Sequence, residues 1–181
     1  MRDKENENVR LRWLPFAIAA VVIVLDRLTK IYIRSHFSNF DSVSVIPGWF
    51  RIVHTENPGA AFGMLADGNP AIRSIVLIGV SVAVLCFVLT VLLKRSSSMA
   101  GTLARLALGF ILGGAIGNLF DRIVAGTVTD FLEVYNGGWT FPAFNAADSA
   151  ITVGAVLLLI DLLRPSHRSL THQHAQPPAE Y

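Results

Sequence analysis

Four long apolar segments alternate with polar stretches along the chain. They cover about residues 13–33, 71–93, 99–120 and 144–163. A helix of about 20 mostly apolar residues crosses the hydrocarbon core of a bilayer, so each segment predicts a transmembrane helix. The apolar core of the first segment, residues 13–25, is followed by residues 26–30 (DRLTK) and not by a small-residue cleavage site. We therefore expect an uncleaved span there and not a signal peptide.

One of the polar stretches has a β-like pattern. Residues 43–53 alternate in polarity and are interrupted by Pro47-Gly48, which indicates one or two short strands. The whole pattern predicts an all-α membrane protein, with four transmembrane helices and a small extracytoplasmic β-sheet or loop cap. We expect a cytoplasmic N-terminal tail over residues 1–12, one membrane domain over 13–164, and a disordered cytoplasmic tail over 165–181.

The composition supports lipid as the main solvent. Of the 181 residues, 52% are hydrophobic and 15% are charged, whereas a soluble domain carries roughly 25% charged residues. The net charge of +2 is small and the charges are dispersed, so we expect no nucleic-acid binding. The sequence has one cysteine, Cys86, and no His-x-x-x-His pair or cysteine cluster. We therefore expect no metal site and no cofactor.

Basic residues set the expected orientation of the spans. They are enriched in three segments that share one side of a four-span protein, which by the positive-inside rule is the cytoplasm. These basic residues are Arg2, Lys4, Arg10, Arg12, Lys94, Arg95, Arg164 and Arg168. Both termini are then cytoplasmic, and residues 35–70 and 121–141 form two outer loops.

Asp26 is an ionisable residue inside a predicted span. Such a group costs about 2.5–3.5 kcal/mol on insertion and needs a physical reason. Lys30 follows four residues later on the same helix face, so the two side chains can neutralise each other. Both a structural ion pair and a role near an active site remain open for Asp26.

Asp130 and Asp148 are the candidate catalytic residues. Asp148 lies near the start of the fourth span, where a helix N-terminus favours a carboxylate and Asn145 could act as a cap, so a structural role is a serious alternative. Asp130 lies in the second outer loop between bulky apolar residues. If this loop folds back over the bundle, the two carboxylates can share one proton and activate a water for attack on a peptide bond.

The third predicted span has a row of small residues and a polar outer end. Glycines at four-residue intervals let another helix approach closely, and we interpret them as packing residues. They are Gly109, Gly113 and Gly117, with Gly114 beside them. Asn118, Asp121 and Arg122 follow; this Asn and ion pair could anchor the helix end or bind a substrate backbone or a polar lipid head group.

Three other functions compete with a peptidase. A small multi-span transporter would spread ionisable residues along the depth of the bundle, whereas here they gather at the outer end. A lipid head-group transferase, with Arg122 and Lys30 gripping the head group, predicts a metal-binding aspartate series or a phosphate loop, which the sequence lacks. A purely structural subunit gives no reason for Asp130 in its apolar setting.

Five sequence blocks in order resemble those of the lipoprotein signal peptidases (signal peptidase II). They are residues 26–30 (DRLTK), 57–63 (NPGAAFG), 113–122 (GGAIGNLFDR), 128–131 (VTDF) and 141–148 (FPAFNAAD). Each block alone is modest, but all five in order are specific, and they cover nearly all of the membrane part. Arg27 departs from the glutamine of many members, and no catalytic position departs.

The resemblance implies an aspartic endopeptidase that cleaves the signal peptide of prolipoproteins just before a diacylglyceryl-modified cysteine. Its two catalytic aspartates fall on Asp130 and Asp148. Its supporting residues fall on Asp26, Asn57, Gly59, Asn118, Arg122 and Asn145. The implied partners are lipid-modified prolipoprotein precursors and membrane phospholipid. The implied location is the bacterial cytoplasmic (inner) membrane, in multi-pass form, with the active site near the outer face.

Overall fold

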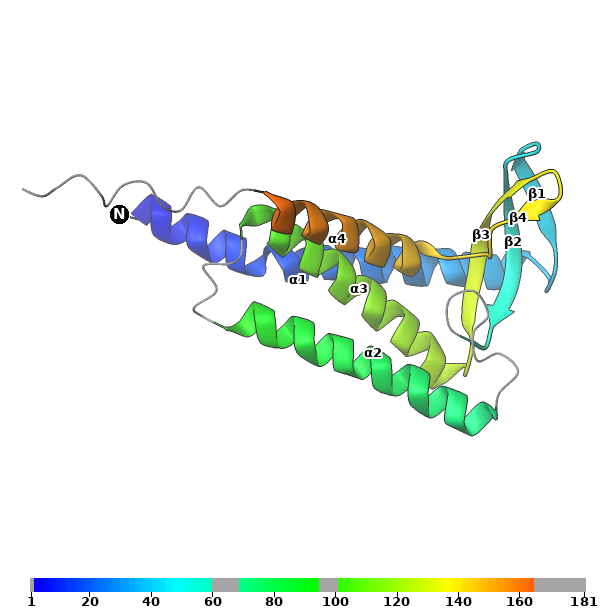
Figure 1. The fold of residues 1–181 in the computed structure, drawn as a ribbon, viewed down its shortest axis with the longest axis horizontal. Helices are drawn as coiled ribbons and strands as arrows, with labels where there is room; N and C mark the ends of the chain where they lie inside the picture. Colours follow the sequence, from blue (N-terminus) through cyan, green and yellow to red (C-terminus); the bar gives the residue numbers. More distant parts are fainter. Residues whose placement is uncertain (1, 60–68, 95–100, 165–181) are drawn as a thin grey trace, which may run out of the picture.

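Four helices lie along one long axis, and a small β-sheet closes one end of them (Figure 1). The computed structural model describes residues 2–59, 69–94 and 101–164, with side chains from residue 11 onward. The helices are α1 (Arg2–His36), α2 (Pro70–Leu93), α3 (Thr102–Val124) and α4 (Ala146–Leu163). For the last three, the bounds lie within a few residues of the predicted spans. Helix α1 is longer than predicted and includes most of the expected N-terminal tail, while the expected C-terminal tail lies outside the described residues.

Helix α3 is the centre of the bundle, since it packs against α1, α2 and α4. The predicted glycine row makes this close packing possible, as expected. A Cβ atom at Gly113 would lie 2.9 Å from the backbone oxygen of Ala19 in α1. A Cβ atom at Gly114 would collide with the backbone oxygen of Ala147 in α4. Glycine therefore lets the backbones of both α1 and α4 approach α3 closely.

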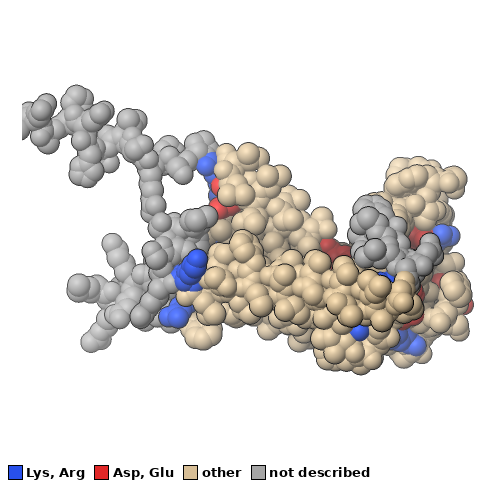
Figure 2. Space-filling view, turned by 60° about the horizontal axis from the view of Figure 1, so that its bottom comes forward, with Lys and Arg blue, Asp and Glu red and all other residues tan. Residues whose placement is uncertain are grey.

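The helices α2, α3 and α4 are long and apolar enough to cross a membrane. In the most apolar stretch of each, 11% of the residues of α2 and 17% of those of α4 are buried, against 56% for α3. The apolar surfaces of α2 and α4 thus face outward, as lipid-facing helices require. On the face shown in Figure 2, most charged side chains lie toward the two ends, and the surface between them is largely uncharged. The first predicted span, residues 13–33 within α1, is not among these three.

The sheet consists of β1 (Ser42–Ile46), β2 (Phe50–Asn57), β3 (Val128–Asn136) and β4 (Trp139–Thr140), all antiparallel in this order. The strands predicted at residues 43–53 are confirmed as β1 and the start of β2. The turn between them uses Gly48 at a φ of +82°, a conformation that favours glycine. The prediction of a loop at Asp130 was wrong, because this residue lies on β3 and pairs with Thr55 of β2. Pairing between segments more than 70 residues apart leaves little local signal in the sequence.

Candidate active site

A cavity of about 640 Å³ lies where α3, α4 and β3 meet at the sheet end of the bundle. Its polar lining consists largely of predicted site residues, namely Asn57, Asn118, Arg122, Asp130 and Asp148. Apolar side chains, among them Val128, Phe144, Ile151 and Val153, form much of the remaining wall. The two predicted catalytic carboxylates therefore face one cavity, although they come from a strand and a helix.

Asp130 is held by two asparagine side chains. Its Oδ2 accepts a hydrogen bond from Asn57 Nδ2 at 2.9 Å, and its Oδ1 accepts one from Asn145 Nδ2 at 2.7 Å. The side chain is only 2% exposed. Burial raises the pKa of Asp130 to about 7, and the negative charge of Asp148 raises it too, against the lowering effect of the two asparagines and Lys30. Near neutral pH, Asp130 therefore exists in both its protonated and ionised forms.

Asp148 belongs to a capping box at the start of α4. Asn145 Oδ1 accepts from the Asp148 backbone N–H at 2.9 Å, and Asp148 Oδ2 accepts from the Asn145 backbone N–H at 3.2 Å. The helix-capping role considered from the sequence is thus confirmed. It leaves Asp148 Oδ1 to accept a second bond, from Asn118 Nδ2 at 2.7 Å. The cap therefore fixes this carboxylate at the cavity wall.

The amide orientations of the three asparagines are all specified by their neighbours. The backbone N–H of Gly59 donates to Asn57 Oδ1 at 2.9 Å, which leaves Asn57 Nδ2 to face Asp130. The capping bond occupies Asn145 Oδ1 in the same way. Asn118 Oδ1 accepts from Lys30 Nζ at 3.0 Å. As a result, all three amide nitrogens point at the two carboxylates, and Gly59 contributes from behind the site.

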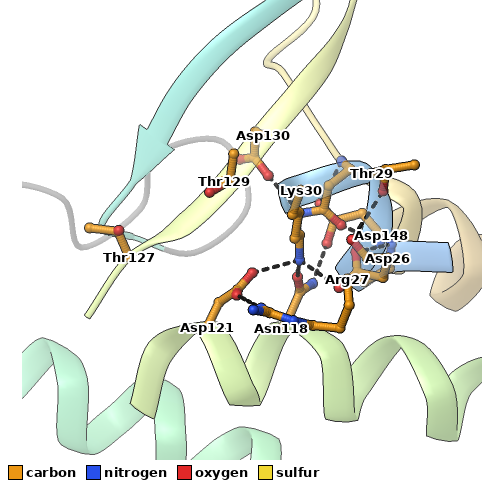
Figure 3. Close-up of polar contacts among 12 residues, drawn as sticks. Asp26, Arg27, Thr29, Lys30, Asn118, Asp121, Thr127, Thr129, Asp130 and Asp148 are labelled. Atoms are coloured by element: carbon orange, nitrogen blue, oxygen red, sulfur yellow. Dashed lines mark hydrogen bonds and ion pairs between the residues drawn. The ribbon is translucent and has the colours of Figure 1, made fainter. Parts of the chain in front are cut away.

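A buried ionic cluster adjoins the Asn118 amide (Figure 3). Lys30 is fully buried, and its Nζ lies 2.8 Å from Asp26 Oδ2 and 2.8 Å from Asp121 Oδ2. Arg27 adds a bond of 2.6 Å to Asp121 Oδ1. The predicted Asp26–Lys30 pair is thus confirmed. Asp26 also reaches the site, because its Oδ1 accepts from the backbone N–H of Ala147 at 3.1 Å.

Asp121 and Arg122, at the polar end of α3, do not pair with each other, so the anchoring ion pair, one of the two roles considered from the sequence, is not formed. Asp121 and Arg122 are adjacent on the helix and point in different directions, since neighbouring helical residues do not share a face. Asp121 faces the cations of α1, whereas Arg122 lines the cavity. The buried Nε of Arg122 makes no hydrogen bond to any described residue. The charge of Arg122 interacts with those of Asp130 and Asp148. Because its Nε has no such bond, this N–H can donate to a group that enters the cavity.

A second polar cluster, not expected from the sequence, joins the sheet to α1. Glu56 of β2 accepts hydrogen bonds from the hydroxyls of Thr127 at 2.6 Å and Thr129 at 2.7 Å. Arg34 of α1 donates to Thr129 Oγ1 at 2.6 Å and lies 3.6 Å from Glu56. Burial alone would raise the pKa of Glu56, but these hydrogen bonds outweigh it and lower the pKa. The cluster fixes the residue that precedes Asp130 on β3.

Comparison with known proteins identifies the family. Residues 18–164 match the family model described as signal peptidase (SPase) II. The chain belongs to the signal peptidase II family. The lipoprotein signal peptidase of Solibacter usitatus is 44% identical over 159 residues, which cover 88% of this chain and 96% of the relative. That of Pseudomonas aeruginosa is 45% identical over 156 residues, which cover 86% and 89%.

Solved structures agree with this assignment. A bacterial membrane enzyme solved by the in meso method at 2.3 Å resolution has a TM-score of 0.73 and 29% sequence identity to this chain. The match covers 90% of this chain and 94% of the solved one. This signal peptidase II is thus a membrane peptidase in which a helical bundle carries a small antiparallel sheet.

Proposed function

We propose that this protein is an aspartic endopeptidase that removes the signal peptide from lipid-modified prolipoprotein precursors, cleaving just before the diacylglyceryl-modified cysteine. Asp130 and Asp148 are its catalytic residues. The observation that carries the proposal is the joint attachment of both carboxylates to Asn145 at the wall of one cavity. The name of the curated relatives, lipoprotein signal peptidase, supports the substrate class.

In this mechanism the two carboxylates share one proton. Both oxygens of Asp148 accept hydrogen bonds, one from Asn118 Nδ2 and one from the Asn145 backbone N–H, so we assign Asp148 the role of the base. Asp130, whose pKa is raised to about 7, holds the proton. Asp148 takes a proton from a water, and the resulting hydroxide attacks the scissile carbonyl carbon. Asp130 gives its proton to the carbonyl oxygen.

Collapse of the tetrahedral intermediate completes the reaction. The C–N bond breaks, the leaving amine takes the proton that Asp148 received from water, and the carbonyl returns its proton to Asp130. One water is consumed and the dyad recovers its single proton. The pair with its single proton carries one negative charge, and Arg122 carries one positive charge. These charges cancel, which lowers the cost of burying them in the cavity wall.

The cavity suits a lipid-modified substrate. Its apolar wall includes Ile151 and Val153 of the lipid-facing helix α4, so an acyl chain and a peptide could occupy adjacent parts of one space. In our proposal, α1 also crosses the membrane, which makes four spans, the sheet end faces outward, and both termini are cytoplasmic. The basic residues of the N-terminal tail support this orientation in the bacterial inner membrane.

The decisive test replaces each carboxylate by its neutral isostere. Asp130→Asn and Asp148→Asn should each lower the cleavage rate of a diacylglyceryl-modified prolipoprotein by roughly 10³-fold or more, because the two residues act as a unit. Asp161→Asn, at the opposite end of α4, is the matched control and should cleave at the normal rate. Either catalytic variant retaining near-normal turnover as folded protein would remove the assignment.

A further inference from the structure

Lys30 has a contact that a purely structural ion pair does not need. Its ammonium lies within hydrogen-bond distance of three acceptors: Asp26 Oδ2 and Asp121 Oδ2, both at 2.8 Å, and Asn118 Oδ1 at 3.0 Å. An ammonium has three N–H donors and no acceptor. Two of the three contacts are hydrogen bonds, to Asp26 and Asn118, and the third, to Asp121, is an ion pair. One of the two hydrogen bonds therefore goes to an uncharged amide. Figure 3 shows the Lys30 side chain directed at Asn118 and Asp121.

Two donors meet the Asn118 amide oxygen, Lys30 Nζ at 3.0 Å and, at the longer distance of 3.3 Å, Asn145 Nδ2. Lys30 is the nearer of the two and the charged one, so it contributes most to the way the Asn118 amide faces. Because Lys30 can only donate, the atom of Asn118 next to it must be the oxygen. The amide nitrogen then faces Asp148 Oδ1 at 2.7 Å. In the reverse orientation, an amide oxygen would face a carboxylate oxygen at this distance. Only a protonated Asp148 could accept that arrangement, because its O–H would have to act as the donor.

We propose that Lys30 is a positioning residue of the peptidase: by holding the Asn118 amide with its nitrogen toward Asp148, it keeps Asp148 as the ionised member of the catalytic pair. This role rests on the proposed function of Asp130 and Asp148. Lys30 then determines which carboxylate acts as the base, although it forms no hydrogen bond to either carboxylate of the pair. The other two asparagines need no such cation, because backbone N–H groups occupy their oxygens.

Several charged residues surround the contact between Lys30 and Asn118, and they come from α1, α3, α4 and β3. Lys30 faces Asp26 on its own helix and Asp121 on α3. Asp121 also pairs with Arg27 and lies 3.6 Å from Arg34. On the cavity side, Asp148 is in the field of Arg122, and Asp130 in that of Asp148. Arg27 thus shares Asp121 with Lys30, but its hydrogen bond goes to Asp121 and not to Asn118, so it offers a matched control.

The experiment is a double-mutant cycle between positions 30 and 118. Lys30→Met alone would leave Asp26 and Asp121 buried without their ammonium and could fail to fold. The cycle is therefore built on Asp26→Asn, which restores the charge balance when Lys30→Met is added and keeps an oxygen for the Ala147 N–H. The four proteins are Asp26→Asn, the same with Lys30→Met, the same with Asn118→Ala, and the same with both changes.

Full-length purified proteins are compared on a diacylglyceryl-modified prolipoprotein in detergent micelles, as kcat and KM against pH and normalised to folded protein. Where Asn118 is intact, Lys30→Met should lower kcat by about 10- to 100-fold with little change in KM. It should also move the acidic limb of the kcat profile to higher pH, by about one unit. In the proteins that carry Asn118→Ala, both effects should largely disappear. Arg27→Met should leave the profile in place.

Equal losses of kcat with and without Asn118→Ala, or a loss with no movement of the acidic limb, would overturn the role of Lys30 and leave a structural ion pair. This result would not touch the catalytic pair itself. The pair is tested separately by Asp130→Asn and Asp148→Asn, whose inactivity does not depend on the coupling between Lys30 and Asn118. The two failures are therefore distinguishable.

Discussion

Asp26 accepts a hydrogen bond from the backbone N–H of Ala147 at 3.1 Å, so a carboxylate of α1 holds the first turn of α4. Asp148 belongs to this turn, next to Ala147. Asp26→Ala should therefore lower both stability and turnover, since it removes this bond and one partner of the buried Lys30, a loss of about 3–5 kcal/mol. Asp26→Asn keeps an oxygen for Ala147 and should retain more activity per folded molecule. Melting curves in detergent and the cleavage assay test this order; equal activity of the two variants would contradict it.

The pKa of Asp130 predicts how stability depends on pH. The folded protein binds a proton at Asp130 up to about pH 7, whereas the unfolded chain releases it near 3.8. Between these values the folded state holds more protons, so its stability falls as pH rises, by up to roughly 4 kcal/mol in all. Asp130→Asn does not titrate and is the matched control. The apparent melting temperature of the wild type should fall relative to this variant from about pH 5 to about pH 8; a constant difference would contradict the prediction.

Asn57 should control the alkaline limit of activity. Its amide donates to Asp130 and lowers the pKa of that carboxyl. Without this donor, the pKa of Asp130 rises further, and Asp130 keeps its proton to higher pH. Asn57→Ala should therefore reduce kcat at the optimum and move the alkaline limb of the kcat profile upward. Asn69→Ala, which removes only the cap of α2, should leave the limb unchanged.

The glycines of α3 should tolerate no side chain where they meet another backbone. Gly114→Ala forces a Cβ against the Ala147 carbonyl, at the helix turn that carries Asp148. We expect a loss of about 1–3 kcal/mol in stability and a larger loss of turnover. Gly79→Ala on α2 meets no atom within 4 Å and should be neutral or slightly stabilising. Similar melting temperatures and rates for the two variants would contradict the packing described for α3.

Chelation should leave cleavage unaffected, because a carboxylate pair activates water without a metal ion. We expect the same rate for the purified enzyme with and without excess EDTA. A loss of activity that added metal restores would be incompatible with the proposed mechanism.

Sequence reasoning succeeded where the signal is local. The bounds of α2 and α4 follow from hydropathy, and the Asp26–Lys30 pair follows from four-residue spacing on one helix. The glycine row of α3 likewise predicted close helix packing. In each case the physical cause lies within one helix or one span, so a single sequence contains it.

Contacts between distant segments were not accessible in this way. The strand that carries Asp130 was missed because its partner, β2, lies more than 70 residues away. The contact of Lys30 with Asn118 joins positions 88 residues apart, and nothing near either residue indicates it. Asp130 and Asp148 were selected through the family resemblance more than through their own surroundings, since each also had an ordinary structural explanation. Their meeting at one cavity depends on tertiary packing.

The fixed amides of Asn57, Asn118 and Asn145 have a consequence for the reaction barrier. In water, solvent dipoles must rotate as charge moves between an acid and a base. Here the corresponding dipoles already face the carboxylates before any substrate arrives, and their neighbours prevent them from turning. The reorganisation that would otherwise accompany each proton transfer has thus taken place once, during folding.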